Sequence, residues 1–177
     1  IYMMLKSSES LGLYSASIGN KKIDWDEFIN QSSAVKLVFK SNVDWLNQYK
    51  SSLIGLISRG GTLEVVLPNP DDPSTVEQLG RQRKKSATVI KESINEAARI
   101  LREIKGNSEK LKIHITNIPF LSHYYIFDKI SIVTIRSYTL SESPHLICGN
   151  KSADNNRLYR YCTEQFDALK KTSVQGI

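Results

Sequence analysis

Apolar and polar positions follow two different periods along the chain, and each period predicts a type of secondary structure. The run at 35–39 is β-branched and aromatic, which is typical of a strand, and the run at 62–68 has the same character. Between them, apolar side chains recur at helical spacing over 46–57, and the Gly60-Gly61 pair ends that pattern. Strand, helix and strand with short connections predict a βαβ unit, whose two strands are parallel.

The remaining patterns add a short helix at 24–29, a long helix and four further strands. The long helix, capped by Ser74 or Thr75, extends over 76–104, and the polar stretch 80–86 could break it in two. The further strands are predicted at 111–115, 124–128, 130–135 and 145–148, and a last helix follows a cap at 152–154. The order β-α-β-α-β-β-β-β-α predicts an α/β fold, more specifically an α+β arrangement of helices around a mixed sheet.

Length and composition fit one domain of ordinary size. The chain has 177 residues, of which 40% are hydrophobic and 24% are charged, as in a globular protein. Residues 1–22 show no strong period, so we interpret them as a leading segment before a single domain at 23–177. The chain begins with Ile1 in place of an initiator Met, which indicates a piece excised from a longer protein.

Several classes of protein find no support in the sequence. Cys148 and Cys162 have neither CxxC nor histidine spacing, which argues against a disulfide framework or zinc site and for buried thiols in a reduced, cytoplasmic compartment. No apolar run approaches the roughly 18 residues of a membrane span, so no membrane partner is expected. P-loop, dinucleotide-binding, GxSxG and HExxH motifs are absent from the sequence. We therefore expect no metal and no cofactor.

The histidines are the candidates for acid–base chemistry, because imidazole titrates near neutral pH. His114 lies between two isoleucines in a strand and His145 begins a strand, so both are interpreted as sheet residues. His123 differs, because it opens a strand that ends in Asp128. Arg136 is at the end of the next strand, and a strand-end His, an Asp and an Arg could converge on a phosphate.

The order of elements and the stretch 122–137 resemble one half of the phospholipase D superfamily, whose pattern is H-x-K-x4-D followed by G-S. Anchored on Asp128, the pattern places Leu121 at the histidine position and His123 at the lysine position, with Ser137 close to the G-S pair. Leucine cannot attack phosphorus, so the resemblance implies a degenerate motif. The chain is also similar to single-unit bacterial modules of this kind that lack the signature and neighbour helix-turn-helix or defence-related domains.

The resemblance implies a non-catalytic module that binds a phosphate-bearing ligand or a protein partner and regulates or senses beside another domain. Polar side chains at strand ends would surround its cleft, since basic groups there still bind phosphate. The expected residues are Lys40, Ser41, Asn69, Arg83, His123, Arg136 and Ser137. The alternative is a phosphodiesterase or nuclease completed by homodimerisation around His123, with Asp128 as its second catalytic residue.

A second alternative is a nucleic-acid-binding module, because the net charge of +6 favours anionic partners. The excess is large at 76–110, which holds nine basic and five acidic side chains. On a helix Arg81, Lys84 and Lys85 would share one side, with Lys91 further along, and such a patch suits phosphates. No aromatic residue interrupts the basic run, so base stacking is not expected.

Overall fold

The computed structural model describes residues 12–18, 23–120, 122–135, 143–149 and 156–175. Within these ranges, one mixed sheet of eight strands has the order β1-β7-β6-β5-β2-β3-β4-β8. The strands are β1 (Leu13–Ile18), β2 (Ala34–Val38), β3 (Thr62–Pro68), β4 (Leu111–Thr116), β5 (His123–Ile126), β6 (Ile130–Thr134), β7 (Pro144–Gly149) and β8 (Val174–Gln175). The helices are α2 (Trp25–Gln31), α3 (Val43–Ser58), α4 (Pro73–Arg83), α5 (Ala87–Lys105) and α6 (Arg157–Lys171).

The sheet has a parallel part and an antiparallel part. β2 pairs in parallel with β3, and β3 pairs in parallel with β4, so the predicted βαβ unit is confirmed. β5 joins the other side of β2 antiparallel, and β6, β7 and β1 continue the antiparallel order. We call the end of the sheet where β2, β3 and β4 finish the carboxyl end, and the opposite end the amino end.

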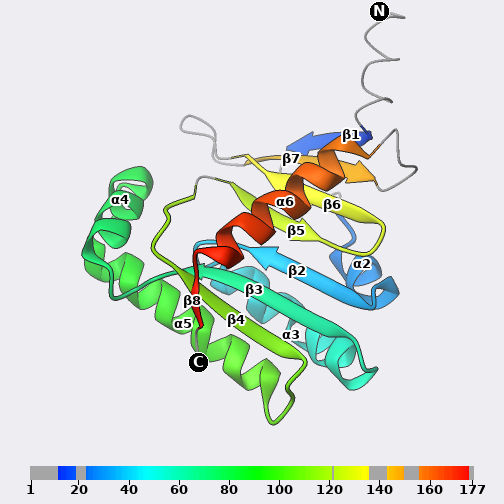
Figure 1. Cartoon of the computed structure of the whole chain (residues 1–177), viewed down its shortest axis with the longest axis horizontal. Coiled ribbons are helices and arrows are strands. Elements are labelled where there is room, and N and C mark those ends of the chain that lie inside the picture. The colour runs from blue at the N-terminus through cyan, green and yellow to red at the C-terminus, as the bar shows by residue number, and fades with distance from the viewer. Residues whose placement is uncertain (1–11, 19–22, 121, 136–142, 150–155, 176–177) are drawn as a thin grey trace, which may run out of the picture.

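Helices cover both faces of the sheet unequally. α2, α3 and α5 pack on one face, where Trp25, Leu53 and Leu101 belong to a large core with inward residues of β2 to β6. α6 crosses the other face, where Phe166 and Cys162 contact a smaller core under β2, β3 and β5. Figure 1 shows α6 in front of the sheet and α3 behind it. The molecule is therefore a mixed α/β fold with helices on both faces, as the sequence predicts.

The long helix predicted over 76–104 is two helices, α4 and α5. Lys84 ends α4 in the left-handed conformation with φ 54°, and Ser86 caps α5 by accepting a hydrogen bond from the Val89 N–H at 3.3 Å. The prediction that Arg81, Lys84 and Lys85 share one side of a helix is therefore wrong, because the helix stops at Arg83. These cations lie around a turn instead.

The leading segment contains one strand that the sequence does not predict. Leu13–Ile18 forms β1 and pairs antiparallel with β7 at the margin of the sheet. Its run of small residues, Ser15 to Ser17, shows no clear alternation of apolar and polar side chains, which is the usual signal of a strand. No helix among the described residues is long and apolar enough to cross a membrane.

Candidate functional site

Four of the predicted site residues lie at the carboxyl end of the sheet. Lys40 and Ser41 follow β2, and Asn69 follows β3. His123 begins β5, which runs antiparallel to β2, so it lies at the same end. Ligands of open sheets with parallel strands commonly bind at this end. Arg136 and Ser137, predicted for the same cleft, lie outside the described residues.

Two of these residues are held by the end of α4. The Lys40 side chain is buried, with 3% exposure, and its Nζ donates to Gln82 Oε1 at 3.2 Å. Arg83 Nη1 donates to Ser41 Oγ at 3.2 Å. Asn69 is oriented differently, because its amide Nδ2 donates to Asn117 Oδ1 at 2.9 Å in the neighbouring loop. The structure therefore brings together Lys40, Ser41 and Arg83, and places Asn69 with Asn117.

A hollow of about 580 Å³ lies beside Ser41, at the start of α3. Arg83 and Lys85 line it, and so do three carboxylates, Asp44, Glu92 and Glu96. The three carboxylates outnumber the two cations, so the hollow does not favour an isolated phosphate. The sequence does not predict the carboxylates at this position, because α5 packs against α3 only in the fold.

Asp128 lies at the amino end of the sheet, away from His123. Five residues of extended chain, at about 3.3 Å each, separate the two by roughly 16 Å. Asp128 Oδ2 accepts hydrogen bonds from the N–H and hydroxyl of Ser33, both at 2.8 Å, and Oδ1 accepts from the Ala34 N–H at 3.0 Å. The predicted convergence of His123 and Asp128 on one phosphate is therefore wrong within a chain.

The hydrogen bonds of Asp128 also set its ionisation. Partial burial pushes the pKa of the Asp128 carboxyl upward, but the hydrogen bonds from Ser33 and Ala34 outweigh burial, and the pKa lies below its ordinary value. The ionised Asp128 carboxylate accepts hydrogen bonds from Ser33 and Ala34, and these bonds join the β5–β6 turn to the start of β2. The role of Asp128 in this fold is therefore structural.

The other two histidines lie in the sheet, as predicted, and both are buried and have partners. His114 Nε2 lies 3.0 Å from Glu64 Oε2, and His145 Nδ1 lies 2.9 Å from Thr134 Oγ1. Burial lowers the pKa of His145.

Cys148 and Cys162 are buried free thiols, and burial raises the pKa of the Cys148 thiol to about 12, so this thiol is no nucleophile at neutral pH. Among the described residues, no cluster of His, Cys, Asp and Glu could hold a metal ion.

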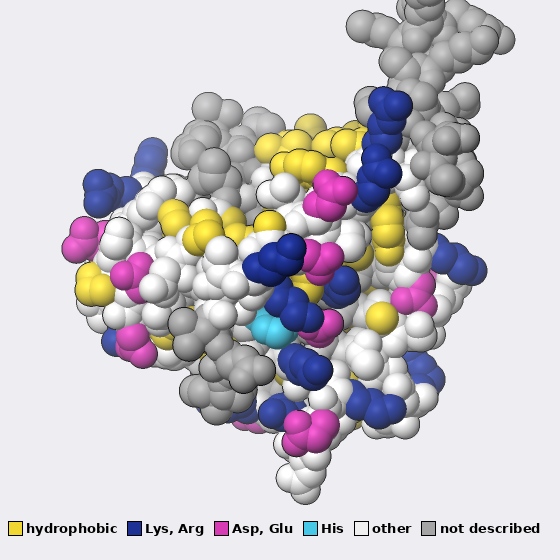
Figure 2. All heavy atoms as spheres, viewed as in Figure 1, with side chains coloured by type: hydrophobic (Ala, Val, Ile, Leu, Met, Phe, Trp, Pro, Cys, Tyr) yellow, Lys and Arg dark blue, Asp and Glu magenta, His cyan; other side chains and the backbone are white. Residues whose placement is uncertain are grey.

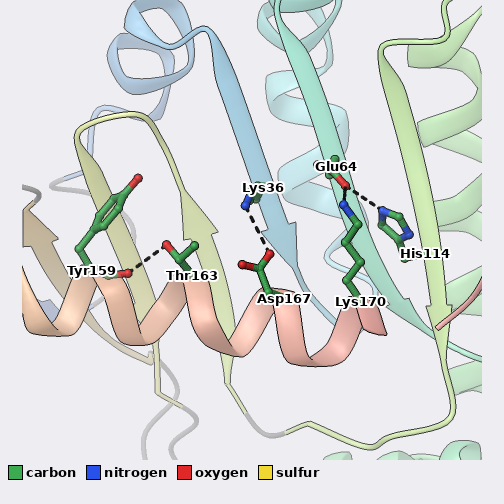
Figure 3. A network of polar contacts seen from close by, with 7 residues as sticks. All are labelled: Lys36, Glu64, His114, Tyr159, Thr163, Asp167 and Lys170. Carbon is green, nitrogen blue, oxygen red and sulfur yellow. Dashed lines mark hydrogen bonds and ion pairs between the residues drawn. The ribbon is translucent and has the colours of Figure 1, made fainter. Parts of the chain in front are cut away.

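A polar network joins α6 to the sheet beneath it (Figure 3). Glu64 accepts from Lys170 Nζ at 2.5 Å and contacts His114, and Lys36 Nζ lies 3.5 Å from Asp167 Oδ1. Burial pushes the pKa of Glu64 upward, but the hydrogen bonds from Lys170 and His114 outweigh it and lower the pKa. These charges bind one another, so they dock α6 on the sheet.

The sequence analysis did not predict this network, although charged residues inside apolar strands indicate it. Lys36 and Glu64 are single charged positions inside otherwise apolar strands, and they face the same side of a parallel pair, opposite each other in register. On the surface of this face, Lys and Arg side chains are interspersed with Asp and Glu (Figure 2). The face that α6 crosses is therefore of mixed charge.

The turn between α4 and α5 has a different character. Between residues 81 and 91 the chain carries five basic side chains and no acidic one; they are Arg81, Arg83, Lys84, Lys85 and Lys91. We call these five residues the basic turn. Arg81 lies 3.6 Å from Glu77, and Lys91 lies 2.8 Å from Asp71. Lys84 and Lys85 are exposed at the tip.

Comparison with known proteins gives a likeness of fold. No protein-family model matches the chain, and no curated protein matches it. The solved structure of TrmBL2, an archaeal chromatin protein with a novel mode of DNA binding, superposes with a TM-score of 0.57 and 12% sequence identity. The match covers 92% of this chain and 53% of that one, so the chain spans about half the length of TrmBL2. The resemblance to the phospholipase D superfamily stays a prediction.

Proposed function

We propose that this chain is a nucleic-acid-binding module that contacts the phosphate backbone through the basic turn. The observation that carries the proposal is the concentration of five basic and no acidic side chains between residues 81 and 91. Lys84 and Lys85 are exposed in the turn between α4 and α5, Arg81 and Lys91 are exposed on the flanking helices, and Arg83 is half-buried. The likeness of fold to a DNA-binding chromatin protein supports this reading over a phosphodiesterase.

The chemistry of the basic turn favours phosphate contacts without base recognition. Lysine ammonium groups bind phosphate as point charges, and no aromatic side chain lies between residues 81 and 91 to stack on a base. The ion pairs of Arg81 and Lys91 are exposed, so a phosphate can replace their carboxylates at little cost. Binding is thus expected to be electrostatic and largely independent of sequence.

The proposal predicts a steep dependence on salt. If about three phosphates are neutralised, affinity for a duplex falls roughly 40-fold between 50 and 200 mM salt, because each contact releases condensed counterions. Fluorescence anisotropy of a labelled duplex at these two concentrations measures the fall. Reversal of the exposed tip, Lys84→Glu with Lys85→Glu, should abolish measurable binding at the lower salt concentration.

The matched control carries the same change of charge elsewhere. Arg102→Glu with Lys112→Glu alters two exposed cations toward the amino end of the sheet. Arg102 lies about 22 Å along α5 from the start of that helix, since each helical residue rises 1.5 Å. This control should keep affinity within about threefold of wild type by charge screening. Absence of binding at 50 mM salt, affinity indifferent to salt, or equal losses in the two variants would overturn the proposal.

A second candidate is a non-catalytic regulatory module that binds a phosphate-bearing ligand in the hollow beside Ser41. The gathering of Arg83 with Ser41 and buried Lys40 favours it. The carboxylates on the same walls require that the rest of the ligand donates hydrogen bonds. Titration with glucose 6-phosphate, whose hydroxyls can donate hydrogen bonds to the carboxylates, tests it by thermal shift: wild type and Arg81→Gln should be stabilised, and Arg83→Gln should not. Equal stabilisation of both variants would dismiss the hollow as the site.

A further inference from the structure

A second cavity lies at the amino end of the sheet, on the face covered by α2. Its volume is about 480 Å³, within the range of small-molecule sites. The walls come from four parts of the fold: β1, α2, the β5–β6 turn and β7. Aromatic and aliphatic side chains form most of them, namely Tyr14, Phe28, Phe127, Ile130 and Ile147.

The aromatic walls are held in place by close packing. The rings of Phe28 and Phe127 lie 5.7 Å apart and tilted, so α2 and the end of β5 fix each other. Tyr14 rests on Gly149: a Cβ at that glycine would lie 1.7 Å from Tyr14 Cε2. Only glycine leaves room for the ring. The pairing of β1 with β7 shifts register between Leu13 and Ser15, so Tyr14 lies at an irregular point of the strand pair.

Polar side chains lie at the rim of this cavity, and they differ in charge and in their capacity for hydrogen bonds to a ligand. Asp128 already accepts three hydrogen bonds, from Ser33 and Ala34, so little of its capacity is left for a ligand. Lys129 lines the cavity and is exposed; it is the cation among the lining residues, and its charge helps to lower the pKa of the neighbouring Asp128 carboxyl. Gln31 and Ser15 add neutral hydrogen-bonding groups.

We propose that this cavity binds a small compound with an aromatic ring system and one anionic group, such as an aromatic carboxylate or sulfonate. The ring lies among Tyr14, Phe28 and Phe127, and the anion faces Lys129. The compound would bind at the end of the sheet opposite the carboxyl-end residues Lys40 and Ser41. The inference stands on its own lining residues and does not depend on nucleic-acid binding.

The test uses two fluorescent probes that differ in charge. Anilinonaphthalene sulfonate carries the proposed anion, and N-phenyl-1-naphthylamine has the same rings without it. Wild type should bind both probes saturably, with one probe per chain. Ser15→Trp places an indole over the cavity from exposed β1 and should weaken both probes at least tenfold. Ala16→Trp is the matched control, because Ala16 is the next exposed residue of β1 and is not among the lining residues.

Lys129→Gln separates the contribution of charge from that of shape. It should weaken the sulfonate probe several-fold and leave the neutral probe within about twofold, since only an anion gains from the ammonium group. Because Lys129→Gln is a mild change at an exposed turn, it still tests the proposed anion contact if Ser15→Trp fails to fold. The proposal is overturned if neither probe saturates, if Ser15→Trp and Ala16→Trp behave alike, or if Lys129→Gln weakens both probes equally.

Discussion

Asp128 illustrates how one side chain can match a catalytic pattern and serve the fold. Its carboxylate joins the β5–β6 turn to the start of β2 through three hydrogen bonds. Asp128→Ala leaves the donors of Ser33 and Ala34 without this partner, and should lower the free energy of unfolding by about 2 kcal/mol, because bonds to a charged group contribute more than neutral ones. Urea unfolding measures the loss, with Lys129→Ala in the same turn as control. Wild-type stability in Asp128→Ala would contradict the structural role.

His145 predicts a dependence of stability on pH. Burial lowers its pKa below the ordinary value of 6.5, so the unfolded chain binds a proton more readily than the folded one. Stability is complete above pH 6.5 and falls as the pH drops below it, with a slope of at most about 1.4 kcal/mol per pH unit for one proton. His145→Gln removes this slope. Chemical unfolding of both proteins at pH 7.5, 6.5 and 5.5 measures it, and parallel curves would exclude His145 as the cause.

At the scale of elements, α6 packs on the face of the sheet opposite α2, α3 and α5, and it is the one helix on that face among the described residues. Phe166 is fully buried there, with Cys162 and Leu169. Phe166→Ala should cost about 3–5 kcal/mol, as large-to-small core changes do. The loss should appear first as faster amide exchange in α6, while α3 and α5 keep their protection on the other face. Tyr161→Ala, at a residue 48% exposed, is the control. Equal deprotection of both faces would contradict independent docking of α6.

Most elements were predictable because their periods are local properties of the chain. Strand 62–68 was predicted with the bounds that β3 has, and the polar residues between Gly80 and Ser86 indicated where the predicted long helix could break. β1 was not predictable, because its alternation is weak and its pairing with β7 comes from distant sequence. Helical periodicity also could not show that Lys84 leaves the helix, since a left-handed residue other than glycine gives no sequence signal.

The candidate site was predictable only in part, for a related reason. The strand order allowed Lys40, Ser41 and His123 to be placed at one end of the sheet. The partners of these residues could not be inferred, because Gln82 and the carboxylates of the hollow reach them from α4, α3 and α5. The placement of Asp128 was missed because matching a motif gives the spacing along a strand and not the end of the sheet at which each residue lies.

At the scale of the whole molecule, the two proposed binding regions lie at different places on the sheet. The basic turn spans the end of α4 and the start of α5, and α4 begins just after the carboxyl end of β3, whereas the aromatic cavity lies at the amino end. No lining residue of the cavity belongs to α4 or α5, which carry the basic turn and its flanks. The fold thus offers room for a small molecule and a polyanion together.

This separation predicts that the two binding events are independent. Mutational effects at sites more than about 10 Å apart without shared partners add within roughly 0.5 kcal/mol. Duplex affinity should therefore change by less than about twofold when the cavity is saturated with N-phenyl-1-naphthylamine, whose neutrality avoids a direct effect of charge. Anisotropy titrations of wild type and Ser15→Trp, each with and without the probe, make the comparison. A larger change in wild type that Ser15→Trp abolishes would show that the cavity controls nucleic-acid binding, because the sheet would then have two arrangements that both ligands bias.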